Sequence, residues 1–275
     1  MIRMTEQAVG RLLTTGTEWG MAEPAPAADE SVRVLVRTTN RDGALLSGVT
    51  AVTVPVGEPI EVGREGDLQI ADEPEDTSVS RIAVRLRPVP GGLVELVVSN
   101  LNGVVLHPWG SRTRYLPSGN EKHLVTGRVG IRVVSGTSLD RPGAAVYWVL
   151  VEGQPAPATR IPLQRSAVTV QNPRPVDLTE AQRAAVSLIF DEHLAWPPLP
   201  APQALTIDAA ARRLGVSSAA VIQRLEGVRK KAYALGMAQQ YGVVDPEYVF
   251  ALVAHGYLEP PSVLVEAEHL DLFPG

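Results

Sequence analysis

The stretch SVRVLVRT, residues 31–38, places valine at every second position, at Val32, Val34 and Val36. Because successive side chains of an extended strand point to opposite faces, a period of two predicts a strand with one buried face. The alternation returns in AVTVPVGE (51–58), GLVELVVS (92–99), GRVGIRVV (127–134) and AAVYWVLV (144–151). Gly, Pro, Asn and Asp separate these runs, as is typical of turns between short strands. We therefore expect residues 31–151 to form an all-β sandwich or barrel of antiparallel strands.

The composition indicates a soluble protein with room for more than one domain. The chain has 275 residues, 45% of them hydrophobic, with a formal net charge of −5. Without cysteine it can form neither disulfides nor cysteine-ligated metal sites. No apolar run reaches the roughly 20 residues that a membrane-spanning helix needs, and the N-terminal residues lack a signal-peptide pattern. We expect a cytoplasmic protein with no membrane partner.

Composition and periodicity divide the chain into five segments. Residues 1–30 contain an Ala/Pro/Glu-rich stretch and predict a flexible lead. The sandwich (31–151) is followed by a Pro-rich linker (152–176). Helical periodicity begins after it and predicts an all-α domain over 177–258. The tail, 259–275, is acidic and apolar, and its pattern indicates no particular structure.

Helix-capping residues occur at the start of each predicted helix. Thr179 and Gln182 have the spacing of a capping box. Thr206 and Ser217 precede two further apolar-periodic stretches and are expected to cap them. Asp245, followed by a proline, is expected to open a last helix.

A group of polar residues lies at the ends of the predicted strands. Gly63-Arg64 ends one run, Ser80-Arg81 begins another, and Asn100 is followed closely by Asn102-Gly103, a turn signal. A phosphate on a peptide needs a guanidinium to meet its charge and short donors to orient it. Loops at one end of a sandwich can supply both from distant parts of the sequence.

The order Gly-Arg, Ser-Arg, Asn-Gly resembles the forkhead-associated (FHA) domain, over roughly residues 31–151. The resemblance implies a sandwich of about eleven strands that binds phosphothreonine peptides. It implies that Arg64 pairs with the phosphate, that Ser80 donates its hydroxyl to it with Arg81 alongside, and that Asn102 holds the peptide backbone. Asn100, with its amide donors and acceptors, is expected in the same phosphopeptide site.

The sequence departs from the FHA pattern at three positions. Ala83 stands where the family usually has a histidine that braces the binding loops. Leu101 replaces a Thr or Ser before Asn-Gly, and Val97 replaces an acidic residue. Losing one hydrogen bond to a charged ligand costs roughly 1.5–3 kcal/mol. Two alternatives stay open: a weakened or altered phosphate pocket, or a purely scaffolding sandwich in which Arg64 pairs with a nearby acidic residue such as Glu65 or Asp67 and Ser80 caps a turn.

The segment TIDAAARRLGVSSAAVIQRLEGVRKKA (206–232) resembles the helix-turn-helix of sigma-factor region 4 and similar bacterial regulators. Together with the FHA resemblance this suggests a protein of actinobacterial type. From Ser217 to Leu235 there are four cations against one anion, Glu226, as expected of a local footprint for DNA phosphates. The resemblance implies DNA contacts by Ser217, Ser218, Gln223, Arg224 and Lys230. The same helix pair could instead dock a protein.

The sequence contains no recognisable catalytic or cofactor motif. None of its five histidines forms a metal-binding pair, and neither a nucleophile elbow nor a phosphate-binding loop occurs. Three tryptophans, Trp109, Trp148 and Trp196, are expected to be packing anchors. We expect a non-enzymatic signalling protein without cofactor or metal. It would bind a phosphorylated protein, either a Ser/Thr kinase or a kinase substrate, and couple that to DNA; the alternative is an adaptor that binds only proteins.

Overall fold

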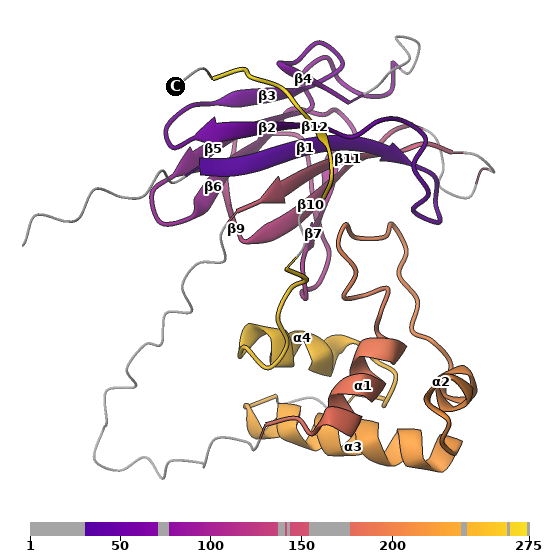
Figure 1. Cartoon of the computed structure of the whole chain (residues 1–275). Coiled ribbons are helices and arrows are strands. Elements are labelled where there is room, and N and C mark those ends of the chain that lie inside the picture. Colours follow the sequence, from indigo (N-terminus) through magenta and orange to yellow (C-terminus); the bar gives the residue numbers. More distant parts are fainter. Residues whose placement is uncertain are drawn as a thin grey trace, which may run out of the picture.

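The computed structural model describes residues 31–70, 77–136, 141, 144–153, 177–237, 241–262 and 265–273. The predicted flexible lead (1–30) and nearly all of the predicted linker, from residue 154 to residue 176, lie outside these residues. Within them, two sheets form a β-sandwich and four helices form a second unit below it (Figure 1).

Eleven strands between residues 31 and 152, with one more from the tail, form the two sheets. The seven-stranded sheet has the order β12-β2-β1-β11-β10-β7-β8 and the five-stranded sheet the order β4-β3-β5-β6-β9. All neighbours are antiparallel except β3 with β4 and β2 with β12. The strands are β1 (Ser31–Thr39), β2 (Thr50–Pro55), β3 (Ile60–Gly63), β4 (Leu68–Gln69), β5 (Val84–Val89), β6 (Leu93–Val98), β7 (Val104–Pro108), β8 (Arg114–Leu116), β9 (His123–Thr126), β10 (Arg128–Val133), β11 (Val146–Glu152) and β12 (Glu268–His269).

The valines of the alternating runs fill the space between the two sheets. Val32, Val34 and Val36 of β1 lie in this core with Val52 and Val54 of β2. The prediction of a β-sandwich from a period of two is therefore confirmed. Apolar burial of this kind contributes about 25 cal/mol per Å² and is the main stabilising term of such a fold.

The helical unit has its own core, which runs from Leu178 to Leu258. Its helices are α1 (Glu180–Ile189), α2 (Ile207–Leu214), α3 (Ser218–Ala234) and α4 (Glu247–Ala254). The capping box of Thr179 is present, and the side chains of Thr206 and Ser217 cap α2 and α3. The Asp245 carboxylate accepts a hydrogen bond from the first backbone N–H of α4 at 3.0 Å. Among the described helices, none has the length and apolar character needed to cross a bilayer.

The outer face of the seven-stranded sheet, on the side away from the five-stranded sheet, is also buried. Every residue of β11 is buried, because a second, smaller core covers this side of the strand. Strand register places the residues of this outer face in three rows across β1, β11, β10 and β7. They are Arg33, Glu152 and Arg128; then Leu35, Leu150, Gly130 and His107; then Arg37, Trp148, Arg132 and Val105.

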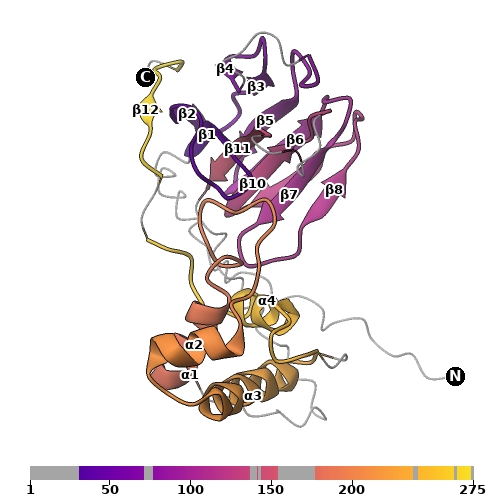
Figure 2. The same ribbon diagram turned by 90° about the vertical axis from the view of Figure 1, so that its right-hand side faces the viewer.

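The loop between α1 and α2 reaches up to this outer face in both views (Figures 1 and 2). Trp196, from that loop, packs in the smaller core. Gly130 makes room for the loop, because a Cβ at this position would lie 2.4 Å from a Pro198 side-chain carbon. On the adjoining edge, the Trp109 indole donates to the Leu194 carbonyl at 2.8 Å.

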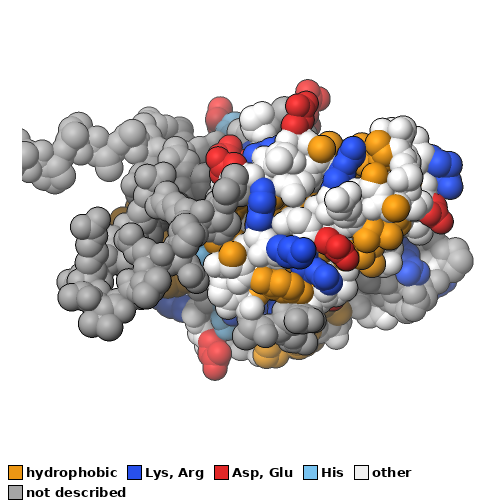
Figure 3. All heavy atoms as spheres, turned by 90° about the horizontal axis from the view of Figure 1, so that it is seen from below, with side chains coloured by type: hydrophobic (Ala, Val, Ile, Leu, Met, Phe, Trp, Pro, Cys, Tyr) orange, Lys and Arg blue, Asp and Glu red, His pale blue; other side chains and the backbone are white. Residues whose placement is uncertain are grey.

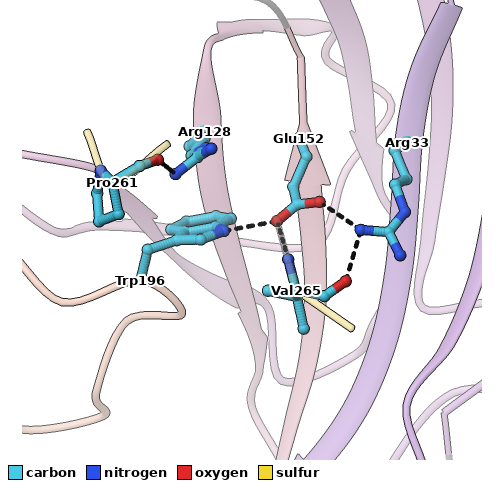
Figure 4. Close-up of polar contacts among 6 residues, drawn as sticks. All are labelled: Arg33, Arg128, Glu152, Trp196, Pro261 and Val265. Atoms are coloured by element: carbon cyan, nitrogen blue, oxygen red, sulfur yellow. Dashed lines mark hydrogen bonds and ion pairs between the residues drawn. The ribbon is translucent and has the colours of Figure 1, made fainter. Parts of the chain in front are cut away.

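Glu152 is the polar centre of this junction (Figure 4). Its side chain is 1% exposed and accepts from Arg33 Nη1 at 2.9 Å. It also accepts from the indole of Trp196 at 2.7 Å and from the backbone N–H of Val265 at 3.2 Å. Arg33 in turn donates to the Val265 carbonyl at 2.6 Å. One buried carboxylate therefore joins the sheet, the helical unit and the tail, while Arg128 donates to the Pro261 carbonyl nearby.

The tail returns to the sandwich rather than trailing away from it. It runs up along the sheet edge, where β12 pairs with β2 (Figure 2). Leu270 and Phe273 pack against the main core. This outcome was not indicated by the sequence pattern, since two paired residues leave no periodic signal.

Candidate functional site

We call the surface formed by Arg64, Ser80, Arg81, Leu101, Asn102 and Tyr115 the loop end of the sandwich. It brings together four residues that the sequence analysis predicted for one site, namely Arg64, Ser80, Arg81 and Asn102. The turn after β3 lies against the turn before β5: the N–H of Arg64 donates to the Ser80 carbonyl at 3.2 Å, and that of Glu65 to the Arg81 carbonyl at 2.9 Å. Gly63 permits this approach, because a Cβ there would lie 2.1 Å from the Arg81 carbonyl oxygen. The glycine of the Gly-Arg pair is thus required by crowding.

Arg64 is half-buried and its side chain is fixed at one point. Its Nε donates to the Val79 carbonyl at 2.6 Å. Neither terminal nitrogen of this guanidinium has a hydrogen-bond partner among the residues that the structure describes. An arginine fixed through Nε keeps two parallel donors available, the geometry that binds carboxylate or phosphate oxygens in pairs.

Ser80 lies in the adjacent turn, and its hydroxyl oxygen accepts from the Leu101 N–H at 3.1 Å. A hydroxyl has one proton to donate besides its acceptor lone pairs. Since the oxygen is occupied as an acceptor from the protein side, its O–H remains a donor for a guest.

Asn100 holds the loops of this surface together from behind. Its side chain is fully buried. The carbonyl oxygen accepts from the Ser80 N–H at 3.1 Å, and the amide nitrogen donates to the carbonyls of Gly103 and Val134, each at 2.8 Å. The structure therefore places Asn100 as a positioning residue beneath the loop end, which differs from the direct peptide contact expected from the sequence.

Asn102 is exposed in the next turn, and its amide donates to the Ser78 carbonyl at 3.2 Å. The turn closes as its Asn-Gly signal predicts, with Gly103 at a φ of +72°. Tyr115 of β8, which the sequence analysis did not single out, donates its hydroxyl to the Asn102 carbonyl at 3.2 Å. Only the pairing of β8 with β7 brings Tyr115 here, so local sequence held no signal for it.

The acidic residues near Arg64 have other partners. Glu65 forms an ion pair with Arg81 at 3.5 Å, with both side chains exposed. The Asp67 carboxylate accepts from the backbone N–H of Glu61 at 2.9 Å. Neither is paired with Arg64, and Ser80 bonds to the distant Leu101 turn. The described residues therefore show no ion pair of Arg64 with either of the two carboxylates named in the scaffolding alternative.

The three departures from the FHA pattern occupy different environments. Val97, on β6, is half-buried. Ala83 is buried, and its carbonyl accepts from the N–H groups of Ser99 and Asn100. Leu101 is 85% exposed at the surface of the loop end. The loops are braced here by Asn100, a role that the resemblance assigns to the missing histidine.

Polar residues of α3 are in part committed to partners inside the helical unit. Ser217 caps the helix, and Ser218 donates to the Asp208 carboxylate at 2.6 Å. Arg229 donates to the Tyr241 carbonyl, and Lys231 to the Gln182 side chain. Gln223, Arg224 and Lys230 have no such bond within the described part of the chain. Seen from below, Lys and Arg side chains are spread over this face with apolar and acidic side chains between them (Figure 3).

Histidines and acidic residues form no metal-binding group in the described part of the chain. His107 is buried on the outer face of the sheet, where desolvation and the charge of Arg132 lower its pKa to about 4. Burial also lowers the pKa of His193, against the opposing effect of Glu192 and Asp245. Both imidazoles are therefore neutral at pH 7.

Fold and site together define a two-sheet β-sandwich with an Arg–Ser cluster at one loop end, joined to a four-helix unit. Solved structures similar to this chain are FHA domains. An engineered FHA domain with a Myc-pTBD peptide is 15% identical, and the match covers 44% of this chain and 91% of that one, with a TM-score of 0.32. The N-terminal FHA domain of S. cerevisiae Rad53p, in complex with a phosphothreonine peptide, is 12% identical over 44% of this chain and 94% of that one, with a TM-score of 0.30. For the FHA domain of CT664 from Chlamydia trachomatis these values are 13%, 44%, 97% and 0.29. No protein-family model and no curated protein matches the chain.

Proposed function

We propose that the loop end binds a phosphothreonine-containing segment of a partner protein and that the chain is a non-enzymatic signalling module. The observation that carries the proposal is the Arg64 guanidinium, which is anchored through Nε and whose terminal nitrogens have no partner among the described residues. Ser80, in the turn bonded to the Arg64 backbone, adds a hydroxyl donor. A dianionic phosphate would satisfy both groups, and charge-assisted bonds of this kind are about twice as strong as neutral ones.

The remaining groups of the loop end complete a peptide site. Asn102 presents an amide to an extended backbone, as the FHA resemblance implies. Leu101 offers an apolar contact for a side chain next to the phosphothreonine, which gives its exposure a role. Arg81, whose side chain is 73% exposed, adds positive charge at the rim. The partner is then a Ser/Thr kinase or one of its substrates, since only these carry the modification.

Calorimetric titration with a threonine peptide, phosphorylated and unphosphorylated, tests this function. We expect binding of the phosphorylated peptide only, weakened tenfold or more by Arg64→Ala because a charge-assisted pair is lost. Arg213→Ala, which removes another cationic side chain, an exposed one on α2, is the control and should leave the affinity unchanged. Equal binding of both peptides, or of neither, would refute the proposal.

For the helical unit we propose protein docking rather than DNA binding. Three of the polar side chains on α3 that could face DNA are bonded inside the unit. The cations of this face are also interrupted by acidic and apolar side chains (Figure 3). A protein that binds duplex DNA needs several cationic side chains at the spacing of the phosphates. The affinity depends on how many counterions these side chains release from the DNA.

Binding to a mixed-sequence duplex over a salt series distinguishes these two functions. We expect no retention near physiological salt. A steep fall of measurable affinity with rising salt, reduced by Lys230→Gln, would establish DNA binding instead. Glu226→Gln, which changes the charge of the same helix in the opposite direction, is the matched control.

A further inference from the structure

A cavity of about 460 Å³ lies where the outer face of the seven-stranded sheet meets the helical unit. Its sheet wall includes His107 of β7 and Arg132 of β10, and its helical wall includes Glu192 and His193. Pockets of 300–1,000 Å³ are typical of small-molecule sites. This cavity shares no lining residue with the loop end, and the proposed phosphopeptide binding does not depend on it.

Three residues that line this cavity carry a buried polar atom without a hydrogen-bond partner in the described part of the chain. His107 is 6% exposed, and its buried Nε2 has no hydrogen bond to any of the described residues. The same holds for the buried Nε of Arg132 and the buried Nδ1 of His193. Unpaired buried polar groups are unusual in folded proteins, so the wall that carries these three is a candidate contact surface for a guest.

Arg132 decides the charge of that guest. It has no ion pair or hydrogen bond within the described part of the chain, and burial lowers its pKa without any carboxylate to oppose the effect. The other charges of the cavity have partners: Arg112 is paired with Glu247, and Glu192 accepts from the Gln203 N–H at 2.7 Å. A guanidinium remains charged even when partly buried, so an unpaired one calls for an anion.

The rest of the wall is apolar and selects for the body of the guest. Pro108, Pro198, Leu199, Pro200 and Phe250 are among the lining residues. A planar carboxylate matches the guanidinium fork, whereas a dianion would meet the nearby carboxylates of Glu192 and Glu247. We propose that this junction cavity binds a small organic monocarboxylate, with its carboxylate on Arg132 and its apolar body against the proline-rich wall.

Phenylacetate serves as the probe, with phenylacetamide as its neutral counterpart and phenyl phosphate as the dianionic one. Titration of the full chain is followed by NMR at the indole N–H of Trp109, which lines the cavity. We expect saturable shifts with phenylacetate below about 10 mM, the range for a ligand of this size. Phenylacetamide should bind at least tenfold more weakly.

Substitutions place the binding in the cavity. Arg132→Gln should weaken phenylacetate binding about tenfold or more, and Arg132→Lys should retain part of it because the charge remains. Arg212→Gln, on the exposed side of α2, should have no effect. Thermal unfolding of each variant shows that it is folded. Absence of saturable binding, equal binding of the amide, tighter binding of phenyl phosphate, or unchanged binding by Arg132→Gln would each overturn the proposal.

Discussion

The loop end and the outer face of the seven-stranded sheet both contain arginines of the same sandwich, but these arginines differ in whether the protein itself pairs them. At the outer face, Arg33 donates to the buried carboxylate of Glu152 and to the Val265 carbonyl, so its charge is paired within the protein. At the loop end, Arg64 is anchored through Nε, and its terminal nitrogens have no partner in the part of the chain that the structure describes. The difference teaches that a paired arginine such as Arg33 holds segments of the fold together. An arginine without a partner among the described residues, such as Arg64, is the one to test for a ligand.

The largest effect is expected at the centre of the outer face. Trp148 is 1% exposed, contacts the ring of His107 edge-on and donates its indole N–H to Thr39. Trp148→Ala should lower the free energy of unfolding by about 4 kcal/mol, through a large cavity and lost burial. Urea denaturation measures it. Tyr115→Ala at the loop end is the control and should change the free energy of unfolding by about 0.5 kcal/mol. Similar losses in both variants would contradict the difference between the outer face and the loop end.

The next effect concerns the carboxylate that joins three segments. Glu152→Ala leaves Arg33, the Trp196 indole and the Val265 N–H without their buried acceptor, and should cost about 3 kcal/mol. Hydrogen exchange at Val265 should become faster, because the tail loses its anchor. Glu95→Ala removes a carboxylate that bonds Arg87 and Lys122 at the surface, and should have a much smaller effect.

A pH effect should also belong to the outer face. The pKa of His107 is lowered to about 4, while its ordinary value is 6.5. Between these values the unfolded chain binds a proton that the folded chain does not, so stability is complete above pH 6.5 and falls as pH drops towards 4. The loss should be about 3 kcal/mol at most.

Urea denaturation at several pH values tests this, with His107→Gln expected to flatten the slope. The charged and titratable groups that line the same cavity are Arg112, Arg132, Glu192, His193 and Glu247. Because the pKa of His193 is lowered as well, a smaller slope of the same sign should remain. An unchanged slope in His107→Gln would contradict the assignment.

The smallest stability effect should be the most informative about the loop end. Asn100→Ala removes three hydrogen bonds and should destabilise the sandwich by about 2 kcal/mol. Phosphopeptide affinity should fall as well, although Asn100 is buried, because the Ser80 turn loses its support. Asn102→Ala should reduce affinity with little change in stability. If Asn100→Ala binds the peptide as well as the original chain, the positioning role is wrong.

Local sequence predicted those features that depend on local chemistry. Alternating valines specified the sandwich, and Thr179, Thr206 and Ser217 were identified as caps because their side chains bond within their own first turns. The Gly-Arg, Ser-Arg and Asn-Gly pairs do meet at one end. That these residues bind a phosphopeptide remains a prediction.

Features that depend on docking were not predicted. The run VYWVLV in β11 reads as one more alternating strand, yet a strand without polar positions is typical of burial on both faces. Trp196 and the tail cover the outer face of β11. Both come from distant segments of the sequence that carry no periodic signal. The junction cavity exists only after both have docked.

The short strand β12 also protects this protein from self-association. Exposed strand edges offer unpaired N–H and C=O groups that recruit other chains. Here the edge at β2 is occupied, since Glu268 and Leu270 donate their N–H groups to Val49 and Ala51. The opposite edge, β8, is only three residues long and begins with arginine. Removing the tail would therefore create a template for edge-to-edge association, so aggregation rather than loss of ligand binding is the first defect to expect from such a deletion.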